Sequence, residues 1–344
     1  MKKLIVICVI FINLCNLCYT QDIHFSQFTD SPLNLNPALT GSIEGEVRGI
    51  LNYRNQWNGI ASPFVTTSVS ADMTLLGNKL GEDWVGAGFV VVNDKAGTGN
   101  LSYLKLMLSG SYFKWLNKWN YLSWGLQAGV VQRKIDIGKL NFGNQFTDDG
   151  YLIAGEPNGE MINGRSSFTN FDMHTGVSWA FIPHEKLKIY SGIGVFHLLR
   201  PQNSFLAFQQ AGLDKESRLG VLHSNVKIGI SRKVDLLPSV LYMRQKQEQE
   251  ITAGTSLGYN FIKDYKFDQM GTIYIGSWYR FADAVIIMAG VEYQSWKVGI
   301  SYDVNVSSLR FANKSKGGPE FSLIYEAPIP TKRRRRPIPC PRFD

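Results

Sequence analysis

Hydrophobic and polar residues alternate with a period of two along most of the chain after residue 44. Between residues 297 and 306, every even position is apolar and every odd position is polar or glycine, and residues 222–233, 252–261 and 285–293 follow the same rule with few exceptions. Because successive side chains of a β-strand point to opposite faces, this pattern predicts strands with one apolar face. The runs are about ten residues or longer, which is the length that a tilted strand needs to cross a bilayer.

Counting these runs gives an even number of strands, as closed single-chain barrels require. The predicted strands are residues 44–55, 63–74, 83–94, 99–113, 119–133, 167–182, 186–199, 219–232, 236–247, 249–261, 270–283, 284–295, 296–307 and 318–329. The sequence therefore predicts an all-β fold, a transmembrane antiparallel β-barrel of about 14 strands that occupies residues 44–330.

Aromatic residues gather toward the ends of the predicted strands, where a ring can contact both lipid and water. They are Trp115, Trp119, Tyr121, Trp124, Tyr259, Phe261, Tyr279, Phe281, Tyr293 and Trp296. A soluble β-sandwich is the alternative, but it does not account for the glycines inside the strands, since glycine weakens a strand interior. These are Gly86, Gly88, Gly125, Gly129, Gly229, Gly254, Gly258, Gly276, Gly290 and Gly299. In a barrel they can face a crowded lumen or permit strong curvature.

The predicted connections are of two kinds. Those at residues 117–118 and 183–185 are short, whereas residues 136–165 and 200–218 are long. In outer-membrane barrels the long loops face outward, and an even strand count places both chain ends in the periplasm.

Residues 1–20 have the features of a secretory signal peptide. Lys2 and Lys3 precede an apolar stretch, and small residues follow at the cleavage site before Gln21. Removal of this segment leaves Cys340 as the single cysteine, so the exported chain is expected to contain no internal disulfide.

The composition narrows the class of protein. The chain is 44% hydrophobic and 19% charged, which argues against a disordered protein. Its formal charge is +8, of which the two lysines of the signal contribute +2 and residues 331–344 contribute +5. The body is therefore close to neutral, which argues against a nucleic-acid partner.

Both ends of the exported chain are unusual. Residues 21–43 contain Pro32 and Pro37, which prevent a regular strand, and Asn36 before Pro37 is a turn or helix-start signal. Two interpretations stay open: a simple leader into the first strand, or an ordered, plug-like segment in or beneath the barrel. The tail, residues 331–344, is basic and proline-rich, and we expect it to dock on an acidic or aromatic periplasmic partner. Its candidate contact residues are Lys332, Arg333, Arg334, Arg335, Arg336, Pro339, Cys340, Arg342 and Phe343.

No catalytic, cofactor or metal site is predicted. The pattern G-x-S-x-G at residues 254–258 lies inside an alternating strand and not at a strand-to-helix turn, so it is interpreted as coincidence. The five histidines show no ligand spacing. Asp172 and His174, two apart on one strand face, are interpreted as a hydrogen-bonded pair in the lumen.

The chain resembles the PorP/SprF family of outer-membrane proteins in the type IX secretion and gliding machinery of Bacteroidetes. The resemblance is carried by Phe25-Ser26-Gln27-Phe28, by Pro32-Leu33-x-Leu35-Asn36-Pro37-Ala38 with Gly41, by Arg54-Asn55-Gln56-Trp57 and by Pro63-Phe64-x-Thr66-x-Ser68. Phe25, Gln27, Asn36, Pro37, Gly41, Arg54 and Trp57 are taken as family-typical positions. The resemblance covers essentially the whole exported chain.

The resemblance implies a non-enzymatic barrel in the cell outer membrane that assists secretion or surface attachment of a large protein. Family members are typically paired with a secreted protein, often an adhesin with a C-terminal sorting domain, and the tail would meet a periplasmic secretion component. Two other classes stay open: an outer-membrane pore or transporter for small, hydrophobic solutes, and an outer-membrane enzyme.

Overall fold

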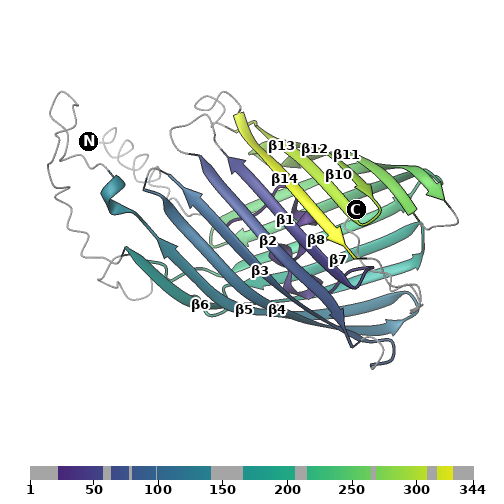
Figure 1. Ribbon diagram of the computed structural model, residues 1–344, viewed down its shortest axis with the longest axis horizontal. Helices are drawn as coiled ribbons and strands as arrows, with labels where there is room; N and C mark the ends of the chain where they lie inside the picture. The colour runs from purple at the N-terminus through teal and green to yellow at the C-terminus, as the bar shows by residue number, and fades with distance from the viewer. Residues whose placement is uncertain are drawn as a thin grey trace, which may run out of the picture.

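The chain folds into a closed β-barrel of antiparallel strands (Figure 1). The computed structural model describes residues 22–56, 63–76, 80–97, 99–140, 166–205, 215–264, 269–307 and 316–327. Within these residues there are fourteen strands, each pairs with its neighbours in sequence, and the first pairs with the last. The predicted fold class is confirmed. The strands are β1 (Val47–Gln56), β2 (Phe64–Leu75), β3 (Trp84–Ala96), β4 (Leu101–Asn117), β5 (Asn120–Lys134), β6 (Ser167–His184), β7 (Leu187–Phe196), β8 (Leu219–Gly229), β9 (Val234–Gln245), β10 (Glu248–Asp264), β11 (Gln269–Arg280), β12 (Ala284–Tyr293), β13 (Trp296–Asn305) and β14 (Lys316–Glu326).

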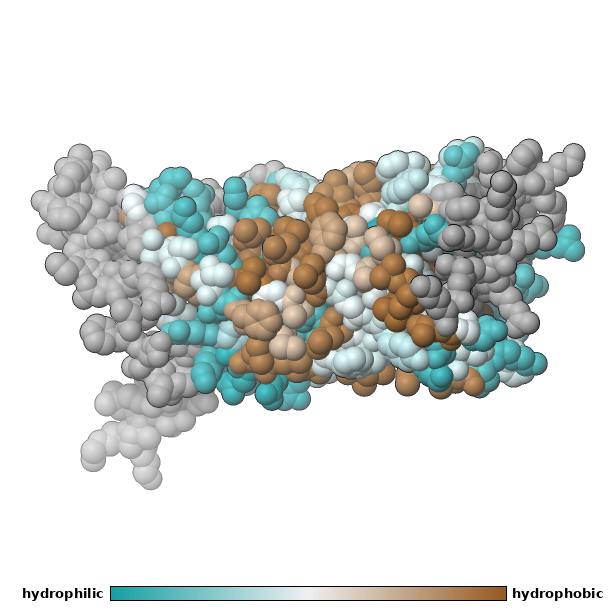
Figure 2. Space-filling view, turned by 60° about the horizontal axis from the view of Figure 1, so that its bottom comes forward, coloured by the Kyte–Doolittle hydropathy of each residue, from teal (hydrophilic) through white to brown (hydrophobic). Residues whose placement is uncertain are grey.

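Each strand turns one face outward and one into the lumen. In β4, Leu104, Leu106 and Leu108 are exposed, whereas Lys105 and Met107 are buried between them. Figure 2 shows the result as an apolar band around the middle of the barrel with hydrophilic residues toward both ends. This is the surface that a lipid bilayer requires of strands crossing it. None of the helices in the described ranges combines the length and the apolar character needed to span a membrane.

Some predicted details are wrong. β4 continues to Asn117, four residues beyond its predicted end, and β6 includes Pro183 and His184, which were assigned to a turn. Tyr121 does not belong to the aromatic girdle, because it points into the lumen and its ring lies 5.4 Å from that of Trp84. The other predicted strand-end aromatics are exposed, apart from half-buried Trp115.

The two ends of the barrel differ. We call the end where β1 begins and β14 ends the terminal end, and the opposite one the loop end. The strand order places both long connections, residues 135–166 and 197–218, at the loop end. Connections at the terminal end include the two-residue turn between β4 and β5, where Asn117 Oδ1 accepts the backbone amides of Trp119 and Asn120.

Residues 22–43 are ordered and run through the lumen; we call them the luminal segment. They contain three short helices, η1 (Phe28–Asp30), α2 (Pro32–Leu35) and η2 (Pro37–Leu39). Each proline stands at the first position of its helix, where its missing N–H costs no hydrogen bond. Near one end of the segment, Asp22 N donates to Gln245 at the loop end of β9, and near the other, Gly41 N donates to Asp72 close to the terminal end of β2. The segment therefore spans the lumen lengthwise.

Candidate functional site

The candidate site consists of the luminal segment and the barrel side chains that hold it. We call these barrel side chains the seat. Most residues of the segment are buried, and Ala38, Asn36 and Thr40 have no exposed surface. A buried backbone must find hydrogen-bond partners, and here the barrel wall supplies them. The wall groups that bond to main-chain atoms of the segment come from Arg48, Asn52, Arg54, Asp72, Thr74, Trp84, Ser111, Ser123, Gln127, Gln245 and Glu320.

Glycines in the wall let the segment approach the strands closely. A Cβ atom on Gly125 of β5 would lie 2.3 Å from the carbonyl carbon and oxygen of Pro37. One on Gly86 would lie 2.0 Å from the carbonyl oxygen of Thr40, and one on Gly299 would lie 2.5 Å from Gln27. The expectation that mid-strand glycines face a crowded lumen is met at these positions. Gly41 of the segment has a φ of +70°, which favours glycine for a second reason.

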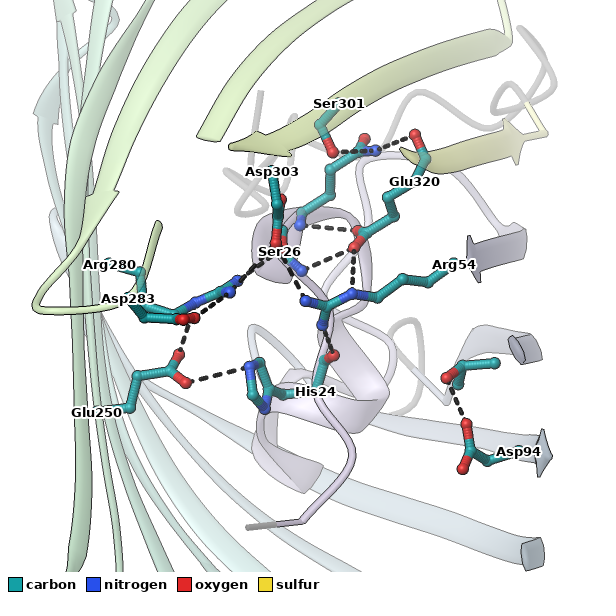
Figure 3. Close-up of polar contacts among 12 residues, drawn as sticks. His24, Ser26, Arg54, Asp94, Glu250, Arg280, Asp283, Ser301, Asp303 and Glu320 are labelled. Carbon is teal, nitrogen blue, oxygen red and sulfur yellow. Dashed lines mark hydrogen bonds and ion pairs between the residues drawn. The ribbon is translucent and has the colours of Figure 1, made fainter. Parts of the chain in front are cut away.

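Glu320 of β14 holds the segment by two successive amides (Figure 3). Its two carboxylate oxygens accept the backbone N–H groups of Ser26 and Gln27, each at 2.8 Å. Arg54 of β1 lies 3.7 Å from the same carboxylate, bonds to Asp303 at 3.1 Å and donates to the carbonyl of His24. Arg54 and Glu320 are the last pair in register between β1 and β14, so the segment is bound where the barrel closes.

A second arginine extends this network toward the loop end. Arg280 contacts Glu250 at 3.4 Å and both Asp283 and Asp303 at 3.1 Å (Figure 3). It also donates to the Ser26 hydroxyl at 2.7 Å, while His24 Nε2 lies 3.1 Å from Glu250. Arg54, Arg280, Glu250, Asp303 and Glu320 are buried, whereas Asp283 is exposed. Removing one of the buried members leaves an opposite charge buried without its full set of partners.

The middle of the segment is held by amide groups. Asn36 caps η2 by accepting the backbone N–H of Ala38, and its side-chain amide donates to the carbonyl of Val177 and lies 3.1 Å from His223 Nε2. Closer to the start of the segment, Asp30 forms a 2.9 Å ion pair with Lys297 of the wall. These contacts fix both the depth and the rotation of the segment in the barrel.

At the loop end, His197 lies between two carboxylates. Its Nε2 is 3.0 Å from Asp22 of the segment, and its Nδ1 bonds to Asp172 of β6. Burial alone would lower the pKa of His197, but the two carboxylates outweigh burial and raise it to about 10. Burial would raise the pKa of Asp22, but His197 holds it well below its usual value. The ring is therefore a cation at neutral pH that bridges the segment and the wall.

The predicted hydrogen bond between Asp172 and His174 is wrong. Their side chains are 4.0 Å apart; His174 Nδ1 instead accepts the backbone N–H of His197, while Asp172 pairs with the ring of His197. Within the described ranges, Asp172, His174 and His197 are the one set of three residues whose ligand atoms could surround a metal ion. Both nitrogens of His197 already face carboxylates, and Lys105 interacts with Asp22, so the charges balance with protein groups and we assign no metal here.

Most predicted family positions meet in the lumen. Phe25, Gln27, Asn36, Pro37 and Gly41 belong to the luminal segment, and Arg54 contacts it from β1. Trp57 and the whole tail, residues 331–344, lie outside the described residues. Ser256 of the G-x-S-x-G pattern lies inside β10, paired with Gly276 of β11, and forms no nucleophile elbow.

Sequence reasoning missed the wall residues that complete the seat. They are Asp72, Gln127, His197, His223, Glu250, Arg280, Lys297, Asp303 and Glu320. Most of these residues occupy the polar positions of alternating strands. Such positions indicate that a face lines the lumen, but they do not identify what occupies the lumen. The usable signal was charge: ionisable residues at several lumen-facing positions need partners when they are buried.

Two cavities flank the segment. One is a pocket partly open to solvent, with about 460 Å³ of space between its lining atoms; it lies between Thr29 and the wall formed by β7 to β13, and its lining includes Asn225, Tyr274 and Trp278. The other, of about 440 Å³, lies between the segment and apolar residues that include Phe196 and Leu241. The segment thus occupies the lumen without filling it.

Comparison with known proteins gives one family and one fold. The family model described as "Type IX secretion system membrane protein PorP/SprF" matches residues 17–325. No curated protein matches the sequence. Among solved structures, the chain is similar to the Ralstonia pickettii toluene transporter TbuX, with 10% identity, a TM-score of 0.50 and coverage of 87% of this chain and 94% of that chain. It is also similar to the CymD monoaromatic hydrocarbon channel, with 11% identity, a TM-score of 0.46 and coverage of 87% and 93%. At these identities the likeness concerns the fold alone.

Proposed function

The chain belongs to the PorP/SprF family of type IX secretion system membrane proteins, and from this premise we propose that it assists secretion or surface attachment of a large partner protein. The partner class is a secreted surface protein, such as an adhesin with a C-terminal sorting domain. The chain is an outer-membrane barrel, and long loops of such barrels generally face outward, so we expect the partner to meet it at the loop end. We propose that the chain acts by binding and not by catalysis.

The observation that carries this proposal is the occupied lumen. The luminal segment runs from Gln245 near the loop end to Asp72 near the terminal end and is bonded to the wall along its length. A passive pore needs an open path, and its wall has no reason to bind a peptide so extensively. A lumen closed by the protein's own chain fits a docking component better.

The basic tail supports a second contact on the periplasmic side. Ala327, the last described residue before the tail, bonds to Val47 and Glu46 at the terminal end. The described part of the chain therefore ends at the terminal end. With six cationic residues against one acidic residue, the tail is suited to an acidic periplasmic component of the secretion machinery.

A pore or transporter for small hydrophobic solutes is the second candidate. It is favoured by the cavity of about 440 Å³ beside the segment, which is lined largely by apolar residues such as Phe28, Phe196 and Leu241. In that case the segment would act as a gate, and transport would need no protein partner.

The two candidates are separated by purification in mild detergent from the native outer membrane, followed by mass spectrometry. We expect a large surface protein and a periplasmic secretion component to copurify, with the periplasmic component lost when residues 331–344 are deleted. A matched variant keeps the length of the tail and replaces residues 332–336 by glutamine, so that charge is removed and chain length is not. If charge mediates the contact, this variant should also lose the periplasmic component. A barrel that purifies alone and conducts ions in a planar bilayer would refute the docking role and favour the pore.

A further inference from the structure

The seat recognises the luminal segment mainly through its main chain. Glu320 accepts two successive amides, Asp72 accepts the amide of Gly41, and Gln127 donates to the carbonyl of Leu33. Ser123 and Ser111 donate to the carbonyls of Ala38 and Thr40. Bonds of this kind are available to any polypeptide in the same path, and peptide-binding sites obtain affinity from them while side-chain pockets give specificity.

The ion pairs of the seat lie largely within the wall itself. Arg48 pairs with Asp72 at 2.7 Å, and Arg54 pairs with Asp303 and Glu320. Arg280 pairs with Glu250, Asp283 and Asp303, all of which belong to the barrel. These pairs persist if the segment leaves. His197 would keep Asp172 but lose Asp22, which also interacts with Lys105, and Lys297 would lose Asp30. An emptied seat therefore keeps the ion pairs within the wall and gains positive charge that an acidic peptide can neutralise, and water can replace the lost main-chain bonds.

The seat is also wider than its occupant. Asn225 is buried and lines the cavity of about 460 Å³, yet neither its side-chain oxygen nor its nitrogen has a hydrogen-bond partner. Gln127 and Asn52 each bond to the segment by their amide nitrogen and leave the carbonyl oxygen without a partner. These polar groups are free to accept or donate further hydrogen bonds, to water or to another peptide in the lumen.

We propose that the barrel lumen is a peptide-binding site, occupied here by the chain's own residues 22–43, and that an extended peptide can take their place. The ligand class is an unfolded polypeptide segment with small residues opposite Gly125 and Gly86 and an acidic residue opposite Lys297. Its source is the exported partner, a step that rests on the proposed function. The luminal segment is then an internal competitor that keeps the lumen closed until the partner's peptide displaces it.

The test uses the full chain with a protease site inserted between Glu44 and Gly45, so that the folded protein is cut after the segment. The probe is a fluorescent synthetic peptide of residues 22–43. We expect saturable uptake that the unlabelled peptide reverses and a scrambled peptide of the same composition does not. Glu320→Gln should weaken uptake roughly tenfold or more, since a buried charge-assisted bond contributes about 1.5–3 kcal/mol. Gly110→Ala, on the outer face of β4, should not change it. No uptake, or equal uptake of the scrambled peptide, would overturn the proposal.

An uncut chain gives an independent measurement if the insertion prevents folding. In a Cys340→Ser background, Thr40→Cys places the single thiol of the exported chain at a position with no exposed surface. Slow but complete labelling by a water-soluble maleimide, without loss of the folded barrel, supports a seat that empties. Labelling only at the rate of global unfolding refutes it. Neither result depends on copurification of a partner, so the peptide site and the secretion role fail separately.

Discussion

Replacing Gly125 by alanine should push the luminal segment from its seat. The new Cβ would lie 2.3 Å from the carbonyl carbon and oxygen of Pro37 and 2.4 Å from the amide nitrogen of Ala38. All three are backbone atoms, so no side-chain rotation relieves the clash and the segment must move. Overpacking of this kind costs about 1–3 kcal/mol. The equilibrium between the seated and unseated segment should shift roughly 5- to 150-fold toward the unseated form.

The assay is the labelling rate of a thiol at position 40 in the Thr40→Cys, Cys340→Ser protein. Thr40 is buried and its hydroxyl lies 2.6 Å from that of Ser109, so a maleimide reacts only when the segment opens. When reclosing is faster than labelling, the rate is proportional to the unseated population. Gly125→Ala should therefore raise the rate by the factor given above.

Alanine substitutions at two further glycines should change the labelling rate by different amounts. Gly110→Ala is the matched control on the neighbouring strand β4, because its Cβ would face outward and meet nothing closer than 3.9 Å. It should leave the labelling rate unchanged. Gly192→Ala should lie between the two, since its Cβ meets the ends of the His223 and Asn36 side chains, which can shift. Equal labelling of the Gly125→Ala and Gly110→Ala proteins, with both barrels folded by heat-modifiable gel mobility, would refute the reasoning.

Three more outcomes are expected. Glu320→Ala removes the acceptor of two buried amides, whereas Ser301→Ala removes one neutral bond to Gln27. Glu320→Ala should therefore lower the thermal unfolding temperature and raise the labelling rate at position 40 more than Ser301→Ala does. Equal effects of the two substitutions would contradict the role assigned to Glu320. The pKa of His197 is raised to about 10, above its usual value of about 6.5, so its stabilisation is fully present below pH 6.5 and lost as pH rises through 10. The stability difference between the wild type and His197→Gln, measured by thermal unfolding, should accordingly be constant from pH 5 to about 6.5, fall steadily above that and reach its minimum near pH 10; a difference that has already disappeared near pH 6.5 would be incompatible with the bridge to two carboxylates. Asn36→Ala should destabilise by about 1 kcal/mol or more, because it removes the cap of η2 and the bond to Val177, and an unchanged unfolding temperature would show that the cap contributes nothing.

The barrel was predictable because its evidence is local. Alternation along each strand, as in residues 297–306, indicates which residues face lipid. A run of about ten alternating residues is as long as a tilted strand that crosses the membrane. The ends of strands were harder to place. β4 and β6 extend beyond the predicted limits because their cross-strand pairing continues after the alternation weakens, as it does from Trp115 to Asn117.

The contacts of the luminal segment were not predictable in the same way. Ser26 and Glu320 are 294 residues apart in sequence, and no periodicity connects them. The interpretation of residues 21–43 had to stay open. The prolines exclude a regular strand, but they do not indicate whether the segment lies inside the barrel or only leads into the first strand. The glycines came closest to the answer: they were predicted to face a crowded lumen or to permit strong curvature, and at Gly86 and Gly125 the structure shows the first. Which segment crowds the lumen could not be read from the sequence.

Contact between Glu320 and the beginning of the segment has a consequence for the order in which the protein is built. Ser26 and Gln27 are among the first residues synthesised, yet the carboxylate that binds their amides belongs to the final strand. The segment cannot be seated until β14 has joined β1, where Arg54 and Glu320 meet. Residues 22–43 therefore lack the acceptor of these two amides until all fourteen strands are made. Seating then reports that the barrel has closed, and a barrel truncated before β14 would display an unprotected peptide to the proteases of its compartment.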